Sequence, residues 1–309
     1  MRVFVTGAAG FLGRIIISEA KGQGHEVLAC SRGASGEACV CWNSDPRVLA
    51  QVIADYSPDA FFHCAGSASV GQSVTAPYED FQASVGTWAT ALEAIRLSKT
   101  NPVVVFPSSA AVYGNPPQLP VHEDSAIAPV SPYGWHKALC EQMAQAHAAS
   151  FGTRLVTARI FSLFGPTQQR LLLWELFQQL AGGAAAVTLA GTGHESRDYL
   201  FEEDAAQALL RLAQVGSTGA PLIVNLAGGA EITVLELAKQ LCVLVDASRP
   251  VHCLGQHRPG DPLRWCADVS RLRSLTSSLA QPDFFTSLQK TVRHWQSLAQ
   301  SPLEPLATA

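Results

Sequence analysis

Two side chains placed four positions apart could carry acid–base chemistry. They are Tyr133 and Lys137, in the segment Ser131-Pro-Tyr-Gly-Trp-His-Lys137. Near the start of a helix, residues four apart lie on one face, so the lysine ammonium can approach the tyrosine phenol and stabilise its deprotonated form. Tyr133 could then accept a proton when a hydroxyl is oxidised and donate one when a ketone is reduced. A Tyr-x-x-x-Lys pair also occurs in helices by coincidence, so this interpretation needs support from the rest of the chain.

Hydroxyl groups that could hold the reacting oxygen lie upstream, in Pro107-Ser108-Ser109-Ala-Ala-Val-Tyr-Gly114. The serines end an apolar run over 103–107 that predicts a buried strand. Open α/β sheets bind ligands at the carboxyl ends of their strands, so a serine here could meet the Tyr/Lys pair. Serine pairs are also common in turns, and the residues alone leave Ser108 and Ser109 both open.

A glycine-rich turn near the start of the chain predicts a dinucleotide site. Thr6-Gly-Ala-Ala-Gly-Phe-Leu-Gly13 follows an apolar strand over 2–6 and opens a helix over 11–21. Small residues there let backbone amides approach a pyrophosphate at the positive end of the helix. A tight turn without a ligand is the alternative interpretation. The predicted cofactor contacts in this turn are Gly7, Ala9, Gly10, Phe11, Leu12 and Gly13.

The class of nicotinamide cofactor should be readable after the second strand, predicted over 26–30. An acidic side chain there would bind the adenosine ribose hydroxyls, and a basic one would accept a 2′-phosphate. The chain has Ser31 and Arg32. A hydroxyl beside a guanidinium suits a phosphate, so this pair favours NADP(H), with NAD as the alternative. An arginine in a surface turn beside Gly33 is the interpretation without function.

Strand and helix patterns alternate through the first part of the chain. Beyond those already named, strands are predicted over 60–64, 155–161 and 221–226, and helices over 87–98, 137–151 and 203–215. This order predicts an α/β fold with a Rossmann-type, doubly wound parallel sheet.

The regular alternation of strands and helices ends after Pro166, which predicts a smaller, mixed α/β C-terminal substrate domain. Its expected elements are helices over 171–180 and 235–245, a strand over 187–190 and a loop over 191–198. We expect the dinucleotide domain over 1–165 and about 198–228, and the substrate domain over 166–197 and 229–309.

Composition narrows the class of protein. The 309 residues are 48% hydrophobic and 15% charged, which is typical of a globular chain. No apolar run reaches the roughly 18 residues of a membrane span, and the chain opens directly into a predicted strand, so we expect a soluble, cytoplasmic protein without a signal peptide. A net charge of −4 without a basic tract argues against nucleic-acid binding. Eight cysteines without framework-like or zinc-like spacing predict reduced thiols and no metal site.

Taken in order, the motifs resemble the extended short-chain dehydrogenases, the family of nucleotide-sugar epimerases, dehydratases and reductases. The resemblance covers nearly the whole chain and implies a catalytic triad of Ser109, Tyr133 and Lys137. The matching segments are the glycine turn, His63-Cys-Ala-Gly66, Ser109-Ala-Ala-Val-Tyr-Gly114, Ser131 to Lys137, Arg197-Asp-Tyr-Leu-Phe201 and Arg258-Pro-Gly-Asp261.

The resemblance also implies the binding residues and the partners. The cofactor would contact Cys64, Ala65, Gly66, Tyr133 and Lys137. A nucleotide-diphosphate sugar would contact Ser109, Tyr133, Ser162, Arg197, Arg258 and Asp261. Relatives form homodimers through a four-helix bundle, for which the candidate contacts are Leu92, Ile95, Met143 and His147.

The type of reaction depends on the residues that follow Ser109. Dehydratases of this family resemble one another in placing an acidic pair there, because eliminating water requires a further acid and base, whereas this chain has Ala110 and Ala111. NADPH-dependent reduction of a nucleotide-linked 4-keto sugar needs only the triad and is favoured by Ser31-Arg32. NAD-dependent 4-epimerisation, the alternative, is favoured by Arg258-Pro-Gly-Asp261. A non-catalytic, dinucleotide-sensing regulator is a third hypothesis, although it would not need an intact triad.

Overall fold

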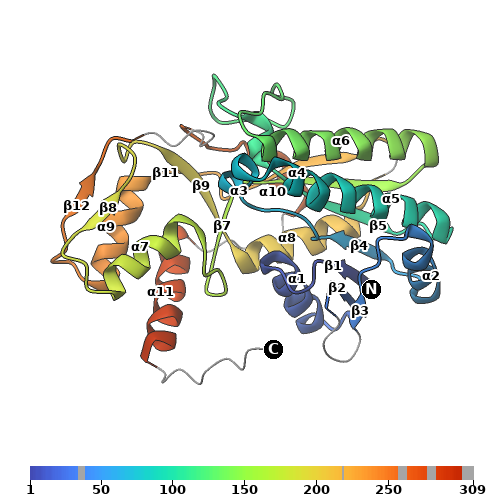
Figure 1. Cartoon of the computed structure of the whole chain (residues 1–309), viewed down its shortest axis with the longest axis horizontal. Coiled ribbons are helices and arrows are strands. Elements are labelled where there is room, and N and C mark those ends of the chain that lie inside the picture. Colours follow the sequence, from blue (N-terminus) through green and yellow to red (C-terminus); the bar gives the residue numbers. More distant parts are fainter. Residues whose placement is uncertain (34–38, 218, 257–262, 277–282, 301–309) are drawn as a thin grey trace.

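The structure is a computed structural model that describes residues 1–33, 39–217, 219–256, 263–276 and 283–300. At its centre lies a seven-stranded sheet whose neighbouring strands pair in parallel (Figure 1). The predicted Rossmann-type α/β fold is therefore confirmed. In spatial order the strands are β10 (Leu222–Leu226), β6 (Arg154–Ile160), β5 (Val103–Ser109), β4 (Ala60–His63), β1 (Arg2–Thr6), β2 (Glu26–Ser31) and β3 (Cys39–Cys41).

Burial on both faces explains the apolar character of the central strands. Every residue of β4 and β5 is buried, and so are the last four residues of β1. Parallel strands that are covered by helices on both sides are continuous apolar runs rather than alternating ones. For this reason the runs were recognisable as strands in the sequence.

Helices cover both faces of the sheet and form two hydrophobic cores (Figure 1). One face packs against α1 (Phe11–Gly22), α8 (Glu202–Val215) and α10 (Ser270–Leu275). The other packs against α2 (Pro46–Tyr56), α5 (Thr87–Ser98) and α6 (Pro132–Phe151). No helix within the described ranges is long and apolar enough to cross a membrane.

Three of the four expected dimer contacts are corrected by the structure. Leu92 and Ile95 of α5 pack in the core between α5 and the sheet, and His147 of α6 is also buried. Met143 is half-buried against the same core. The spacing of apolar residues on α5 and α6 therefore reflects packing of these helices against the core of the same chain.

The helix α6 begins at Pro132, whereas the sequence pattern predicted a start at Lys137. Its N-cap is Ser131, whose hydroxyl accepts the amide of Gly134, and a proline occupies the first turn. Both features are typical of helix starts. Tyr133 and Lys137 consequently lie on one continuous helix.

Short helices connect the main elements on the side of the sheet where the strands end. Between β4 and α5 the chain forms α3 (Val70–Thr75), α4 (Pro77–Phe81) and a π-helical turn, η1 (Gln82–Gly86). Directly after β5 it forms a 3-10 turn, η2 (Ala110–Tyr113).

A smaller α/β unit lies at one side of the main sheet (Figure 1). β7 (Ser162–Phe164), β9 (Ser196–Phe201) and β11 (Glu231–Thr233) form one sheet, and β8 (Val187–Leu189) pairs with β12 (Val251–Cys253). α7 (Leu171–Ala181), α9 (Val234–Val245) and α11 (Phe284–Gln300) pack with them around a third core. The mixed α/β character agrees with the predicted fold class, while the domain boundaries stay a prediction.

Strand β9 occupies the end of a segment, 191–198, for which the sequence predicted a loop. Ser196 and Asp198 are polar, yet neither has accessible surface. The Asp198 carboxylate accepts the backbone amides of Gly228 and Ala267 at 2.8 and 2.9 Å. The prediction was wrong because polar residues suggested exposure, whereas their hydrogen bonds are made inside the protein.

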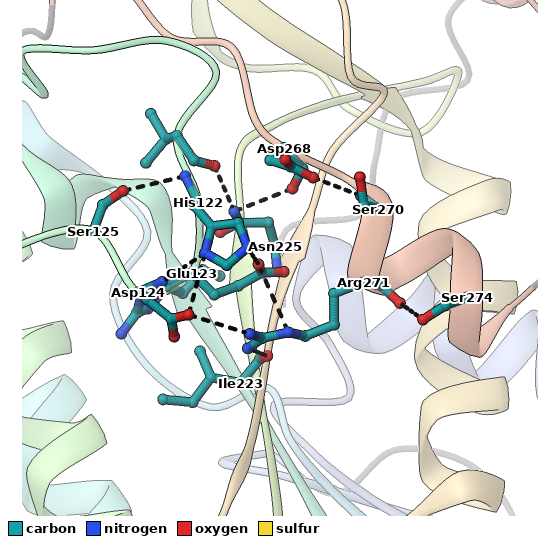
Figure 2. A network of polar contacts seen from close by, with 12 residues as sticks. His122, Glu123, Asp124, Ser125, Ile223, Asn225, Asp268, Ser270, Arg271 and Ser274 are labelled. Carbon is teal, nitrogen blue, oxygen red and sulfur yellow. Dashed lines mark hydrogen bonds and ion pairs between the residues drawn. The ribbon is translucent and has the colours of Figure 1, made fainter.

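A polar network ties the loop after η2 to the C-terminal part of the chain (Figure 2). The buried carboxylate of Glu123 accepts the backbone amide of Asn225 in β10 at 2.9 Å and lies 3.8 Å from Nε of Arg271 in α10. Asn225 donates its side-chain amide to the carbonyl of Val121. Val121 also pairs with Ala267 in an isolated parallel bridge. These contacts join the loop after η2 to β10 and to the segment that leads into α10.

Candidate active site

A cavity of about 740 Å³ lies at the carboxyl ends of the central strands and reaches the smaller unit. The predicted catalytic residues Ser109, Tyr133 and Lys137 all border it. Residues 10–12 of the glycine turn and residues 64–66 contribute to its wall. The structure thus brings the predicted catalytic and cofactor segments together at the place where open α/β sheets bind ligands.

The glycine turn has no room for side chains where it meets the end of β4. A Cβ atom on Gly7 would lie 2.4 Å from the carbonyl of Cys64, and Gly7 has a φ of +66°. A Cβ atom on Gly13 would lie 2.4 Å from the carbonyl oxygen of Gly7. Gly10 is the N-cap of α1, and both Ala9 and Gly10 are exposed. The backbone at the positive end of α1 is therefore accessible to an anion such as a pyrophosphate.

The residues after β4 form the part of the cavity wall beside the glycine turn. Ala65 donates its amide to the hydroxyl of Thr6 at 3.3 Å, and Gly66 has a φ of +146°. Burial raises the pKa of the Cys64 thiol to about 12, although the positive charge of Lys137 opposes this shift. Cys64 is therefore a protonated, unreactive part of the wall.

His63, the last residue of β4, also borders the cavity. Its Nδ1 lies 3.1 Å from the Thr6 hydroxyl, and its buried Nε2 has no hydrogen-bond partner in the described part of the chain. Burial, and after it the positive charge of Lys137, lower the pKa of His63 to about 3. The imidazole is therefore neutral at physiological pH. The sequence marked His63 only as part of a motif and gave no sign of its charge state.

The two serines at the end of β5 have different partners. Both border the cavity, but consecutive residues of a strand point to opposite faces of a sheet. Ser109 Oγ accepts the amide of Ala111 at 3.2 Å, and Ser108 Oγ donates to the carboxylate of Glu141 at 2.5 Å. Ser108 is thus held by α6, which favours Ser109 as the hydroxyl that meets a ligand.

Glu141 belongs to a buried polar network beneath the site. Its carboxylate pairs with Arg159 of β6 at 2.8 Å, and the two side chains are only 6% and 4% exposed. Arg159 donates to the hydroxyl of Tyr113, which donates to the side chain of Asn225. Removing one partner of a buried ion pair costs about 3–5 kcal/mol, so the network holds β5, β6 and α6 in a fixed arrangement.

Lys137 connects the catalytic helix to the end of β5. The lysine is buried, and its Nζ donates to the carbonyl of Pro107 at 2.9 Å. The same atom lies 5.7 Å from the centroid of the Tyr133 ring. Tyr133 is half-buried and borders the cavity. The lysine and the tyrosine therefore lie on the same face of α6, as residues four apart on a helix do.

The predicted NADP(H) residues lie outside the lining of this cavity. Ser31, the last residue of β2, is buried and donates its hydroxyl to the carbonyl of Gly33 at 2.5 Å. Arg32 is exposed. Because the serine proton is used within the turn, the guanidinium is the group of the Ser31-Arg32 pair that is left to attract a 2′-phosphate.

Two of the predicted substrate residues outside the triad, Ser162 and Arg197, border the cavity. Arg258 and Asp261 lie outside the described residues. The guanidinium of Arg197 lies 5.6 Å from the ring centroid of Trp265, which also borders the cavity.

Trp265 is a cavity residue that the sequence analysis did not identify. The indole of Trp265 is buried and donates to the carbonyl of Gly114 at 3.1 Å. A tryptophan within a polar segment was the available signal. A lone aromatic residue is more often part of a core, so the signal was too weak to use.

Comparisons with known proteins show the family of the chain. A sequence model described as the NAD dependent epimerase/dehydratase family matches residues 3–227. The chain belongs to this family. It is 29% identical over 327 aligned residues to the UDP-glucose 4-epimerase of Azospirillum brasilense, covering 97% of this chain and 93% of that protein.

Solved structures of similar proteins have the same fold. The UDP-N-acetylglucosamine 4-epimerase of Methanobrevibacter ruminantium M1, in complex with UDP-N-acetylmuramic acid, matches with a TM-score of 0.84 at 27% identity, covering 96% of this chain and 98% of the other. MoeE5 in complex with UDP-glucose and NAD matches with a TM-score of 0.85 at 26% identity, covering 96% and 99%.

Two alanines follow Ser109 directly. Ala110 and Ala111 are 0% and 6% exposed and begin η2. An alanine methyl group can neither donate nor accept a proton. The two positions after Ser109 therefore add no acid or base to the predicted triad.

Proposed function

We propose that this family member catalyses the NAD-dependent 4-epimerisation of a nucleoside-diphosphate sugar, with a UDP-sugar as substrate. The observation that carries the proposal is that Ser109, Tyr133 and Lys137 border one cavity beside two buried alanines. These three side chains suffice to move a proton on and off one sugar hydroxyl. The similarity to UDP-sugar 4-epimerases supports the same activity.

The residues take distinct roles in this reaction. Tyr133 removes the proton of the C4 hydroxyl and later returns it, while Lys137 stabilises the phenolate. Ser109 holds the sugar oxygen by a hydrogen bond. When bound, NAD supplies the acceptor and then the donor of the C4 hydride. The glycine turn between Gly7 and Gly13, whose backbone amides are not covered by side chains, would hold the pyrophosphate of NAD.

We infer NAD as the cofactor in place of the NADP(H) that the sequence favoured. The hydroxyl of Ser31 is engaged with Gly33, and the similar protein MoeE5 was solved with NAD. An epimerase returns the hydride that it removed, so it needs no supply of reductant.

Net reduction of a 4-keto sugar with NADPH is the second candidate function. It is supported by Arg32, which is exposed directly after β2, where a guanidinium can accept a 2′-phosphate. Epimerisation is preferred because the similarity to epimerases extends over nearly the whole chain.

The deciding experiment incubates the purified protein with UDP-glucose and UDP-N-acetylglucosamine, without added cofactor. Epimerisation predicts a 4-epimer of unchanged mass, separated by chromatography, and NAD retained through purification. A product heavier by two hydrogen atoms, formed from a 4-keto sugar only when NADPH is added, would support the second candidate. Tyr133→Phe should lower turnover on the order of 10²–10⁴-fold, and unchanged turnover would contradict both.

We also propose a homodimer formed through the outer face of α6. Trp135 and Leu139, one turn apart on α6, are 55% and 39% exposed, and Tyr78 and Phe81 on the adjacent α4 are 69% and 37% exposed. Apolar side chains gathered in this way are typical of an interface. Sedimentation should give a dimer for the wild type and a monomer for Trp135→Glu; a wild-type monomer would contradict the proposal.

A further inference from the structure

The segment between β4 and α5 packs against the catalytic helix. We call residues 69–81, which include α3 and α4, the arm. Both helices of the arm contact α6, and Figure 1 shows them beside it. Residues 69–71 of the arm border the cavity. The arm therefore touches both the site and the helix that carries Tyr133 and Lys137.

Two polar contacts join the arm to the first turns of α6. The buried hydroxyl of Ser73 accepts the backbone amide of Tyr133 at 3.1 Å. One turn further, Nδ1 of His136 lies 2.5 Å from Oδ2 of Asp80. The amide of Tyr133 belongs to a helix start, where it has no partner within the helix. The arm supplies that partner.

The pairing of Asp80 with His136 is well protected from water. The two side chains are 1% and 13% exposed, and the ring of Phe81 meets the imidazole edge-on at 5.4 Å. The second oxygen of Asp80, Oδ1, is buried without a hydrogen-bond partner in the described ranges. A buried carboxylate is costly unless it is paired, so the position of His136 is tied to that of Asp80.

His136 is placed where it can set the rotation of α6. It directly precedes Lys137 and follows Tyr133 by three residues, so all three lie within the first two turns. From the side of the sheet, α6 is held by Lys137 at the carbonyl of Pro107. The arm and the sheet thus hold the first turns of α6 from two directions, and loss of the His136 contact would loosen them on the side of the arm.

We propose that Asp80 and His136 are positioning residues that keep the Tyr133 phenol aligned with Ser109. Neither side chain borders the cavity, so both act through the helix. This role rests on the proposed epimerase function. Misplacement of a reacting group by about 1 Å can cost on the order of 100-fold in rate, so a modest rotation of α6 would be measurable.

The test compares three substitutions on α6. His136→Leu removes the contact, and His136→Asn keeps an N–H donor close to the position of Nδ1. His147→Leu is the matched control, because His147 is a buried histidine on the same helix whose Nδ1 pairs with Thr153 at 2.8 Å, away from the cavity. Both leucine variants lose a buried polar contact, but only one should disturb the site.

We expect His136→Leu to lower kcat for UDP-sugar epimerisation by about tenfold or more, with KM within about twofold of the wild type. His136→Asn should recover most of that loss, and His147→Leu should retain wild-type kcat. The proposal is overturned if folded His136→Leu keeps wild-type kcat, if His147→Leu loses as much, or if His136→Asn recovers nothing.

Hydrogen exchange measured by mass spectrometry provides a readout that needs no substrate. Deuterium uptake by the peptide over 131–137 should rise in His136→Leu and stay unchanged in His147→Leu. Equal uptake in wild type and His136→Leu would overturn the positioning role even if the protein had no epimerase activity. A wild type without that activity would instead refute the proposed function.

Discussion

Replacing His63 should change the way in which stability depends on pH. In the folded protein, burial and the charge of Lys137 lower the pKa of His63 to about 3. A histidine in an unfolded chain titrates near about 6.5. Between these values the unfolded chain binds a proton that the folded protein does not bind. The free energy of unfolding must therefore decrease as the pH falls below about 6.5.

The size of this effect follows from the two pKa values. A group that titrates only in the unfolded state changes the free energy of unfolding by about 1.4 kcal/mol per pH unit. Between pH 7 and pH 5, His63 alone should thus lower it by about 2 kcal/mol. The figure depends on the unfolded pKa alone, provided that the folded imidazole stays neutral at pH 5.

Urea unfolding followed by circular dichroism at pH 7 and pH 5 measures the effect. The wild type should lose about 2 kcal/mol more than His63→Gln on acidification, because only the wild type carries the buried imidazole. His252→Gln removes an exposed histidine and is the control, which should behave as the wild type does. Equal losses in the wild type and His63→Gln would refute the claim that burial keeps His63 neutral.

Three further predictions concern residues at the site. Ser109→Ala should abolish most turnover with little change in stability. Ser108→Ala should lower the free energy of unfolding by about 1–3 kcal/mol, because the buried Glu141 carboxylate loses one donor while Arg159 still donates to it. Kinetics and denaturation of both variants check this. Gly7→Ala should destabilise the protein by about 1 kcal/mol or more and weaken NAD binding. Gly22→Ala is the control, because an added Cβ there meets nothing within 4 Å, and it should change neither stability nor NAD binding. Calorimetry measures both quantities. Cys64 should resist iodoacetamide at pH 8 while the exposed Cys41 and Cys253 react, because burial raises the pKa of Cys64 to about 12. Mass spectrometry of the labelled peptides that finds Cys64 modified first would contradict this.

The fold was predictable because its decisive signals are local in the sequence. Continuous apolar runs report strands that are buried on both faces, and the glycine turn reports a strand that passes directly into a helix. The spacing of Tyr133 and Lys137 likewise reports a shared helix face. Each of these signals lies within a few residues of the feature that it predicts.

The remaining features depend on partners that are distant in the sequence. Asp198 is buried because its hydrogen-bond donors include Ala267, and Ser108 is turned inward by Glu141. Spacing within one segment carries no record of such partners.

Three titratable side chains close to Lys137 are neutral at physiological pH. Three titratable neighbours experience its positive charge, and burial keeps all three neutral: the pKa of His63 falls to about 3, while those of Cys64 and Cys140 rise to about 12 and about 11. None of them can take a proton from a substrate at physiological pH. With alanines after Ser109, Tyr133 is left as the acid and base of the triad. The proposed interconversion of a hydroxyl and a ketone on one carbon needs no second acid or base beside Ser109.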